Sequence, residues 1–294
     1  MKIGKILFLF SVLFYIATRI INLEAYPIYF FADEAIQAVK AEEILSNGGK
    51  DLNGSFLPMT ISGFNAGNML GLSIHFNMPG VLIFGKHVWT VRLTTVILSI
   101  LGGLFTALTL KNIFKLKNYW VAMAFLAINP IFFIHSRTGF ETAISTSFFA
   151  GFLYFYLYYL STRKIKWGAF SIFMAAVAAY TYAGIWLTII VAITIFTVSD
   201  IRFHFASIRK SLLLIMFSFF IFIPLVITQI SNRNRVVEVI ENRSSYLVEN
   251  YSIIKKGDLF IHKYIHTLNP QFLFFYEPTD EPRHYVKGYT FFPV

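Results

Sequence analysis

The sequence has no cysteine among its 294 residues, which excludes disulfides, thiol catalysis and metal sites with cysteine ligands. Charged residues are scarce too, since they make up 14% of the chain against about 25% in soluble domains. This scarcity argues against a water-soluble domain and against a disordered chain. What is abundant is apolar surface, because 56% of the residues are hydrophobic and 34 of them are Phe. The composition indicates an all-α polytopic membrane protein.

Charge-free runs long enough to cross a bilayer recur along the chain, and each such helix needs about 20 apolar residues. The runs cover residues 6–21, 92–111, 117–141, 141–163, 167–199 and 210–233. Residues 167–199 are too many for one span, so we expect a tight turn at 180–184 that divides them into two helices. The sequence therefore predicts about seven transmembrane helices. Arg19, at the end of the first run, is expected to extend outward to the membrane surface.

The connection at residues 22–89 is the longest between predicted spans, and we expect it to be extracytoplasmic with interfacial helices. Its uncharged part, 52–85, is interrupted repeatedly by Asn, Gly and Pro. A backbone broken so often would leave unpaired polar groups in lipid, so this part is predicted to lie at the membrane surface. Residues 1–230 then form a seven-helix membrane module, and 231–294 a further extracytoplasmic region.

The positions of the basic residues predict the orientation, because cytoplasmic loops of membrane proteins are rich in Lys and Arg. With the N-terminus in the cytoplasm, the predicted inner segments contain one acid, Asp200, and eleven basic residues: Lys2, Lys5, Lys111, Lys115, Lys117, Arg163, Lys164, Lys166, Arg202, Arg209 and Lys210. These charges account for the whole net charge of +10. A nucleic-acid partner is not needed to explain it. We expect a multi-pass protein of a prokaryotic plasma membrane.

Nearly all residues suited to chemistry fall on the predicted outer side. A site there has no access to cytoplasmic nucleotides, so its energy-rich substrate must arrive through the membrane, attached to a lipid. Asp33 and Glu34 begin a predicted helix in the first outer loop. One reading is structural, with Asp33 as the cap and both acids complementing the helix dipole. The other is a general base near the lipid surface.

Five more outer residues have both a structural and a functional reading. Arg92 begins a span and is an anchor or a site residue, and Arg137 either pairs with Glu141 or binds a lipid phosphate through its planar fork. Arg283 and His284 stand among aromatic residues, as in an interfacial belt or in a surface that meets lipid phosphate. The seven His residues show no metal-ligand spacing.

The ordered set of these segments resembles the GT-C membrane glycosyltransferases, in the branch of the dolichyl-phosphate-mannose protein mannosyltransferases and the bacterial aminoarabinose transferases. The matching pieces are the acidic pair 33–34 with Ala35, the loop 49–54 with Leu57-Pro58, Phe84-Gly85, Arg92 between Val91 and Leu93, Ser136-Arg137 with Glu141, and 269–274 leading to Arg283-His284 and Gly288. Their order on one membrane face follows the family pattern over essentially the whole chain.

The resemblance implies a transferase that takes a sugar from a polyprenyl- or dolichyl-phosphate donor and gives it to a protein, lipid or glycan acceptor, with inversion. Asp33 would be the catalytic carboxylate, with Glu34 and Arg92 supporting it. Arg137, Arg283 and His284 would hold the lipid phosphate. The resemblance implies no definite cofactor, and a divalent cation is a candidate.

Two departures from the family pattern bear on this reading. Lipid A-modifying relatives often have a charged Glu-Lys-Pro motif where residues 65–69 of this chain have no charge, so the sugar and the metal stay open. The chain also stops at Val294, within the outer region where relatives continue, and we expect it to be an N-terminal portion. A transporter or lipid flippase is the alternative, and a catalytically silent scaffold is the third.

Overall fold

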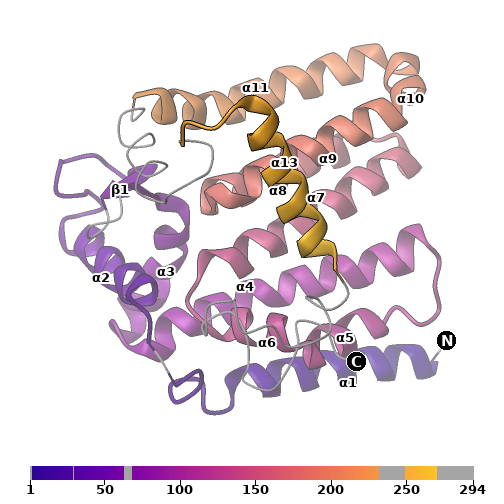
Figure 1. Ribbon diagram of the computed structural model, residues 1–294. Helices are drawn as coiled ribbons and strands as arrows, with labels where there is room; N and C mark the ends of the chain where they lie inside the picture. The colour runs from indigo at the N-terminus through magenta and orange to yellow at the C-terminus, as the bar shows by residue number, and fades with distance from the viewer. Residues whose placement is uncertain (1, 29, 63–67, 232–248, 270–294) are drawn as a thin grey trace.

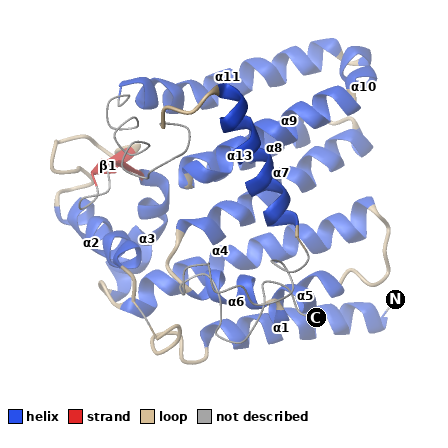
Figure 2. Ribbon diagram, in the orientation of Figure 1, coloured by secondary structure: helices blue, strands red, loops and turns tan. Residues whose placement is uncertain are grey.

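The computed structural model describes residues 2–28, 30–62, 68–231 and 249–269, and within them it is built almost entirely of helices (Figures 1 and 2). Four described helices are long and apolar enough to cross a membrane. They are α1 (Lys2–Ile20), α4 (Val88–Leu108, continued by the π-turn η1, Thr109–Ile113), α7 (Glu141–Thr162) and α11 (Ile208–Ser231).

The other predicted spans are shorter helices. Residues 167–199 form α8 (Ile165–Thr181) and α9 (Trp186–Ser199), separated by the short helix η2 (Ala183–Ile185). The predicted break at 180–184 is therefore confirmed. The run 117–141 is also broken, into α5 (Val121–Ile128) and α6 (Pro130–Arg137). A mostly helical architecture with helices suited to a membrane is confirmed. The count of seven crossings stays a prediction.

These helices lie side by side in a bundle (Figure 1). α7 packs on both α4 and α8, and small residues let the backbones approach closely. A Cβ added to Gly102 of α4, for example, would lie 2.7 Å from the Oγ of Ser147 on α7. The buried apolar cluster around Ile144, Phe152 and Ala178 then joins α7 and α8 into the core of the bundle.

At one end of the bundle lies a cap made from the first long connection (Figure 1). It consists of α2 (Ala32–Ser46), an antiparallel hairpin of β1 (Thr60–Ser62) and β2 (Asn68–Leu70), and α3 (Gly71–Phe84). α3 packs on α2 and α4. The sequence predicted that residues 52–85 do not form a spanning helix, and in the structure they form no continuous helix. The position of the cap relative to a membrane stays a prediction.

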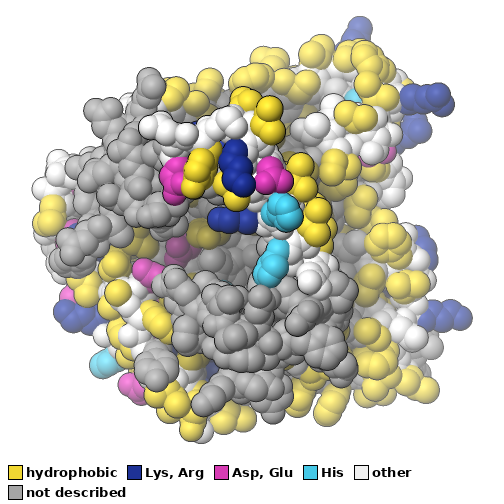
Figure 3. Space-filling model, in the orientation of Figure 1, with side chains coloured by type: hydrophobic (Ala, Val, Ile, Leu, Met, Phe, Trp, Pro, Cys, Tyr) yellow, Lys and Arg dark blue, Asp and Glu magenta, His cyan; other side chains and the backbone are white. Residues whose placement is uncertain are grey.

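The opposite end contains the N-terminus and α10 (Ile201–Ala206) (Figure 1). Figure 3 shows several Lys and Arg side chains along this edge. Along α7, Glu141 begins at the cap and Arg163 follows the other end, about 33 Å away at 1.5 Å per residue. The basic segments predicted to be cytoplasmic thus lie at one end and Asp33 at the other.

Beyond the bundle, α13 (Ile253–Leu268) is the one described helix of the predicted outer region 231–294. Its apolar residues Ile253, Ile254 and Ile265 are exposed. This agrees with the amphipathic pattern of its sequence.

The prediction that Arg19 extends outward is wrong, because its side chain is fully buried between α1, α5 and α6. Its Nη2 and Nη1 donate to the carbonyl oxygens of Leu126 and Ala127, both at 2.7 Å, and its Nε to Ser136 Oγ at 3.0 Å. In a continuous helix the Leu126 oxygen would accept from residue 130, but Pro130 has no N–H. Arg19 thus pairs carbonyls that the helix break leaves without helical partners.

Replacing Arg19 with Met is therefore expected to lower the free energy of unfolding by about 2 kcal/mol or more, since buried acceptors lose their donors. Thermal unfolding in detergent measures the change. Arg202→Met, at an exposed position on α10, is the matched control and should change little. Equal stability of the two variants would contradict the assigned role of Arg19.

Candidate active site at the capped end

The site centres on the first turn of α2, where Asp33 is exposed and Glu34 is fully buried. The helix begins after Phe31, and the Glu34 carboxylate accepts the Phe31 backbone N–H at 3.2 Å. The reading of Asp33 as the cap is therefore wrong, because Glu34 closes the N-terminus. Asp33 is left facing outward in the first turn, with its side chain available to a substrate.

Glu34 forms a buried ion pair with Arg92, whose side chain is also fully buried. Arg92 Nε lies 2.9 Å from Glu34 Oε1, and its Nη2 lies 3.2 Å from Oε2. The backbone N–H of Gly139 donates to Oε1 at 2.7 Å. Both oxygens of Glu34 thus have partners from three separate segments. The carboxylate joins the start of α2 to α4 and to the turn between α6 and α7.

Gly139 is required by this close approach. A Cβ at that position would lie 2.5 Å from Cγ1 of Val91 and 3.5 Å from Glu34 Oε1. A side chain at this position would therefore clash with Val91, next to Arg92 on α4, and the turn or Val91 would have to shift.

Arg92 also binds the chain that leads from α1 to α2. Its Nη1 donates to the carbonyl oxygens of Leu23, Glu24 and Pro27 at 3.0–3.2 Å. The Arg92 guanidinium therefore holds both the segment that leads to α2 and the Glu34 carboxylate in the first turn of α2. The role of Arg92 in supporting a catalytic residue stays a prediction.

Arg137 is buried at the end of α6 and also binds the segment that leads from α1 to α2. Its guanidinium donates to the carbonyl oxygens of Thr18, Ile21, Asn22 and Tyr26 at 2.6–3.2 Å. Thr18 and Ile21 lie at the end of α1, where the helix leaves carbonyl oxygens without helical partners. Asn22 and Tyr26 belong to the connection that leads to α2. A lipid phosphate would have to compete with these carbonyls, so the structure places Arg137 in the scaffold of the first loop.

Glu141, at the start of α7, lies near enough to Asp33 for the two carboxylates to interact electrostatically. Gln37 connects Glu141 to the cap: its Nε2 lies 3.5 Å from Glu141 Oε2 and 3.1 Å from Ser73 Oγ of α3. Sequence reasoning missed Gln37. The signal was its spacing, since residue 37 lies one turn after Asp33 on the same face of a helix.

Two hollows lie at the capped end, and neither has Asp33 or Glu141 in its lining. One, of about 270 Å³, lies between α6 and α7 and is lined by His135, Thr142 and apolar neighbours, with His135 Nδ1 3.3 Å from Thr142 Oγ1. The other is an open groove of about 620 Å³ beside Asn22, Glu24 and Trp89. Sequence analysis did not select His135, although it stands in the same outer turn as Arg137.

Two predicted residues, Arg283 and His284, lie outside the described residues. Within the described ranges, no three His, Asp or Glu side chains gather as ligands for a metal ion. The arrangement thus offers one exposed carboxylate, a second carboxylate beside it and hydrogen-bonding side chains, all at the capped end.

Comparisons with known proteins agree with this architecture. Two crystal structures of ArnT from Cupriavidus metallidurans share the fold, one in the apo state and one bound to undecaprenyl phosphate. The apo structure has a TM-score of 0.56 over 84% of this chain and 44% of that chain. The bound structure has a TM-score of 0.57 over 89% of this chain and 48% of that chain. Each of the two sequences is 16% identical to this chain. The chain thus spans about half the length of these proteins.

No curated protein sequence matches the chain. The sequence pattern of the family described as dolichyl-phosphate-mannose-protein mannosyltransferase matches residues 77–227, just over half of the chain. The matched range includes Arg92, Arg137 and Glu141 and begins after Asp33 and Glu34. The chain belongs to this mannosyltransferase family of the GT-C superfamily.

Proposed function

We propose that the protein transfers a sugar from a polyprenyl-phosphate donor to an acceptor hydroxyl, with Asp33 as general base. The observation that carries this proposal is the contrast within one helical turn. Asp33 is exposed, whereas Glu34 beside it is buried with both oxygens occupied. A catalytic carboxylate must be free to take a proton and must also be held in place, and the pair divides these tasks.

The reaction is a direct displacement at the anomeric carbon. The acceptor oxygen attacks that carbon, its proton passes to the Asp33 carboxylate, and the bond from carbon to phosphate oxygen breaks. The polyprenyl phosphate leaves with the bonding electrons, and the configuration at carbon inverts. Cationic groups would stabilise the leaving phosphate. Arg283 and His284 are the proposed contributors, and a divalent cation is a further candidate.

The other residues have positioning roles in this proposal. Glu34, Arg92 and Arg137 hold the segment between α1 and α2, which fixes where Asp33 stands. Glu141 and Gln37 would orient the acceptor or the sugar hydroxyls. In the proposed orientation, with the N-terminus in the cytoplasm, Asp33 would lie on the outer side of the plasma membrane, where a lipid-linked donor is accessible.

Transfer from defined donors tests the proposal. Membranes from cells that express the intact protein would receive undecaprenyl-phosphate and dolichyl-phosphate donors, each with a labelled sugar. We expect label in an acceptor fraction together with an equal amount of free polyprenyl phosphate. A flippase would move the intact donor between leaflets without breaking the bond to phosphate, and that result would overturn the transferase assignment.

A further inference from the structure

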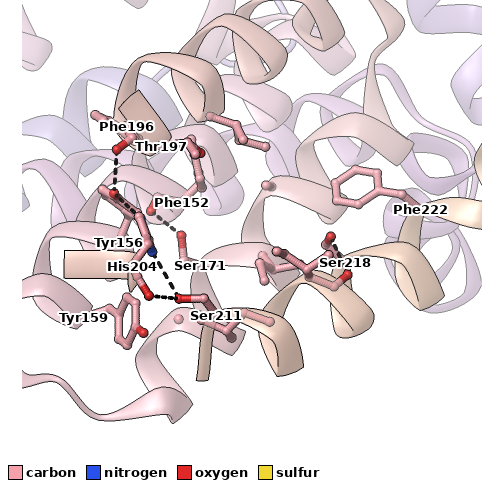
Figure 4. A pocket seen from close by; sticks show the side chains of 16 residues that line it. Phe152, Tyr156, Tyr159, Ser171, Phe196, Thr197, His204, Ser211, Ser218 and Phe222 are labelled. Carbon is pink, nitrogen blue, oxygen red and sulfur yellow. Dashed lines mark hydrogen bonds between the residues drawn. The ribbon is translucent and has the colours of Figure 1, made fainter. Parts of the chain in front are cut away.

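A further cavity, separate from the two hollows described above, lies at the basic end of the bundle, remote from Asp33. It has a volume of about 220 Å³ and lies among α7, α8, α9, α10 and α11. Figure 4 shows its lining, which is mostly apolar and includes the rings of Phe152, Phe196 and Phe222. Tyr156, in this lining, is 15 residues after Glu141 on α7, about 22 Å along the helix.

The cavity opens towards the lipid-facing side of the bundle. Ile193 of α9 and Ile215 of α11 both line it and are 43% and 49% exposed. α9 packs loosely here, since Ile189 is its one buried residue. An apolar chain can therefore enter from the side, between α9 and α11.

One end of the cavity is polar (Figure 4). The Tyr156 hydroxyl donates to Asp200 Oδ2 at 2.8 Å and lies 3.2 Å from His204 Nε2. Tyr159 also lines the cavity and is 1% exposed, yet its hydroxyl has no hydrogen-bond partner among the described residues. A buried hydroxyl without a partner costs free energy. A ligand oxygen at this end would supply the missing acceptor.

The rim beside this polar end is strongly basic. Between residues 162 and 211 the sequence has one acid, Asp200, and six basic residues: Arg163, Lys164, Lys166, Arg202, Arg209 and Lys210. The two loops that contain them touch, since Lys210 Nζ donates to the Arg163 carbonyl at 2.9 Å. The Arg163 guanidinium lies 5.7 Å from the Phe203 ring, which lies 5.2 Å from the Tyr159 ring.

We propose that this cavity binds an anionic phospholipid from the leaflet at the basic end. One acyl chain fills the cavity, an oxygen of the lipid accepts from Tyr159, and the phosphate lies on the basic rim. Basic pockets between helices on this side of a membrane are suited to such headgroups. The bound lipid holds α9 and α11 against α7 and α8, where protein contacts are few.

Two tyrosines on α7 make a matched test. Tyr159→Phe keeps the ring and removes the unpartnered hydroxyl, so affinity for phosphatidylglycerol should fall about tenfold or more, while the lipid-free protein is as stable as before. The Tyr154 hydroxyl accepts from Asn112 Nδ2 at 3.0 Å and is outside the cavity. Tyr154→Phe should therefore lose stability and bind the lipid normally.

The rim is tested by removing charge. The triple variant Lys164→Gln, Lys166→Gln and Arg209→Gln should lose about fivefold in phosphatidylglycerol affinity per residue. Lys164 and Lys166 lie at the start of α8 and Arg209 at the start of α11, two helices that line the cavity. The control changes Lys111, Lys115 and Lys117 to Gln, in the connection between α4 and α5, two helices that contribute no lining residue. Binding is measured by native mass spectrometry and by displacement of a fluorescent phosphatidylglycerol.

Several outcomes would overturn the proposal. These are equal affinity for phosphatidylglycerol and phosphatidylcholine, equal losses in the two charge variants, and unchanged binding by Tyr159→Phe. Stronger displacement of the labelled lipid by undecaprenyl phosphate than by phosphatidylglycerol would identify a different occupant. None of these variants alters a residue of the capped end, so sugar transfer and lipid binding are read separately.

Discussion

Asp33→Asn is expected to reduce sugar transfer by about 100-fold or more, the effect of removing a positioned general base. The amide has nearly the shape of the carboxylate but accepts no proton at neutral pH. Since Asp33 is exposed, the change should leave stability within about 0.5 kcal/mol of the original protein. Initial rates with a labelled polyprenyl-phosphate sugar and thermal unfolding of the same preparation measure the two effects.

The control for Asp33→Asn is Glu42→Gln, which removes a partly exposed carboxylate from the same helix. Glu42 pairs with Lys86 at the surface, and such pairs contribute little. Transfer by this control should match the unaltered protein. If Asp33→Asn also retains full turnover, the base lies elsewhere, and Glu141 becomes the carboxylate to test next.

The sequence predicted those features of the fold that depend on local composition. Long charge-free runs became helices, and the polar turn at 180–184 separates α8 from α9. The break inside 117–141 had a local signal too, because Asn129 caps α6 by accepting the Phe132 N–H at 2.9 Å, with Pro130 next in the chain. Asn followed by Pro is a helix start, and this signal was overlooked.

The roles of the arginines were not predictable in the same way. Arg19, Arg92 and Arg137 each stand near a helix end, where a guanidinium suits a lipid phosphate as well as a backbone carbonyl. Their actual partners are 58–119 residues away in sequence, apart from local contacts. Only the three-dimensional arrangement shows that these side chains bind the protein's own backbone. Spacing in a single sequence does not contain that information.

The same limit explains why the sequence did not show that Glu34 is buried and Asp33 is exposed. Both acids begin a helix, and the sequence favours neither as the buried one. Which one points inward depends on the position of Arg92 and of the Gly139 N–H. Exposure in the folded protein therefore distinguishes the candidate base from its support.

The second large effect is expected from the Glu34–Arg92 pair. Glu34→Gln or Arg92→Met alone should lower the free energy of unfolding by about 3–5 kcal/mol, because each leaves a buried charge without its partner. The double variant should lose less than the sum of the two, since no unpaired charge remains. Chemical unfolding of the four proteins in detergent gives the coupling energy, and the surface pair Glu42–Lys86 provides the control cycle, expected at about 0–1 kcal/mol.

Activity in this cycle distinguishes a positioning role from a purely structural one. Arg92 holds the carbonyls of Leu23, Glu24 and Pro27, so its loss frees the segment that leads to Asp33. The double variant should therefore regain stability but not turnover, with kcat reduced more than KM is raised. Additive stability losses, or full turnover in the folded double variant, would contradict the view that this buried pair sets the position of Asp33.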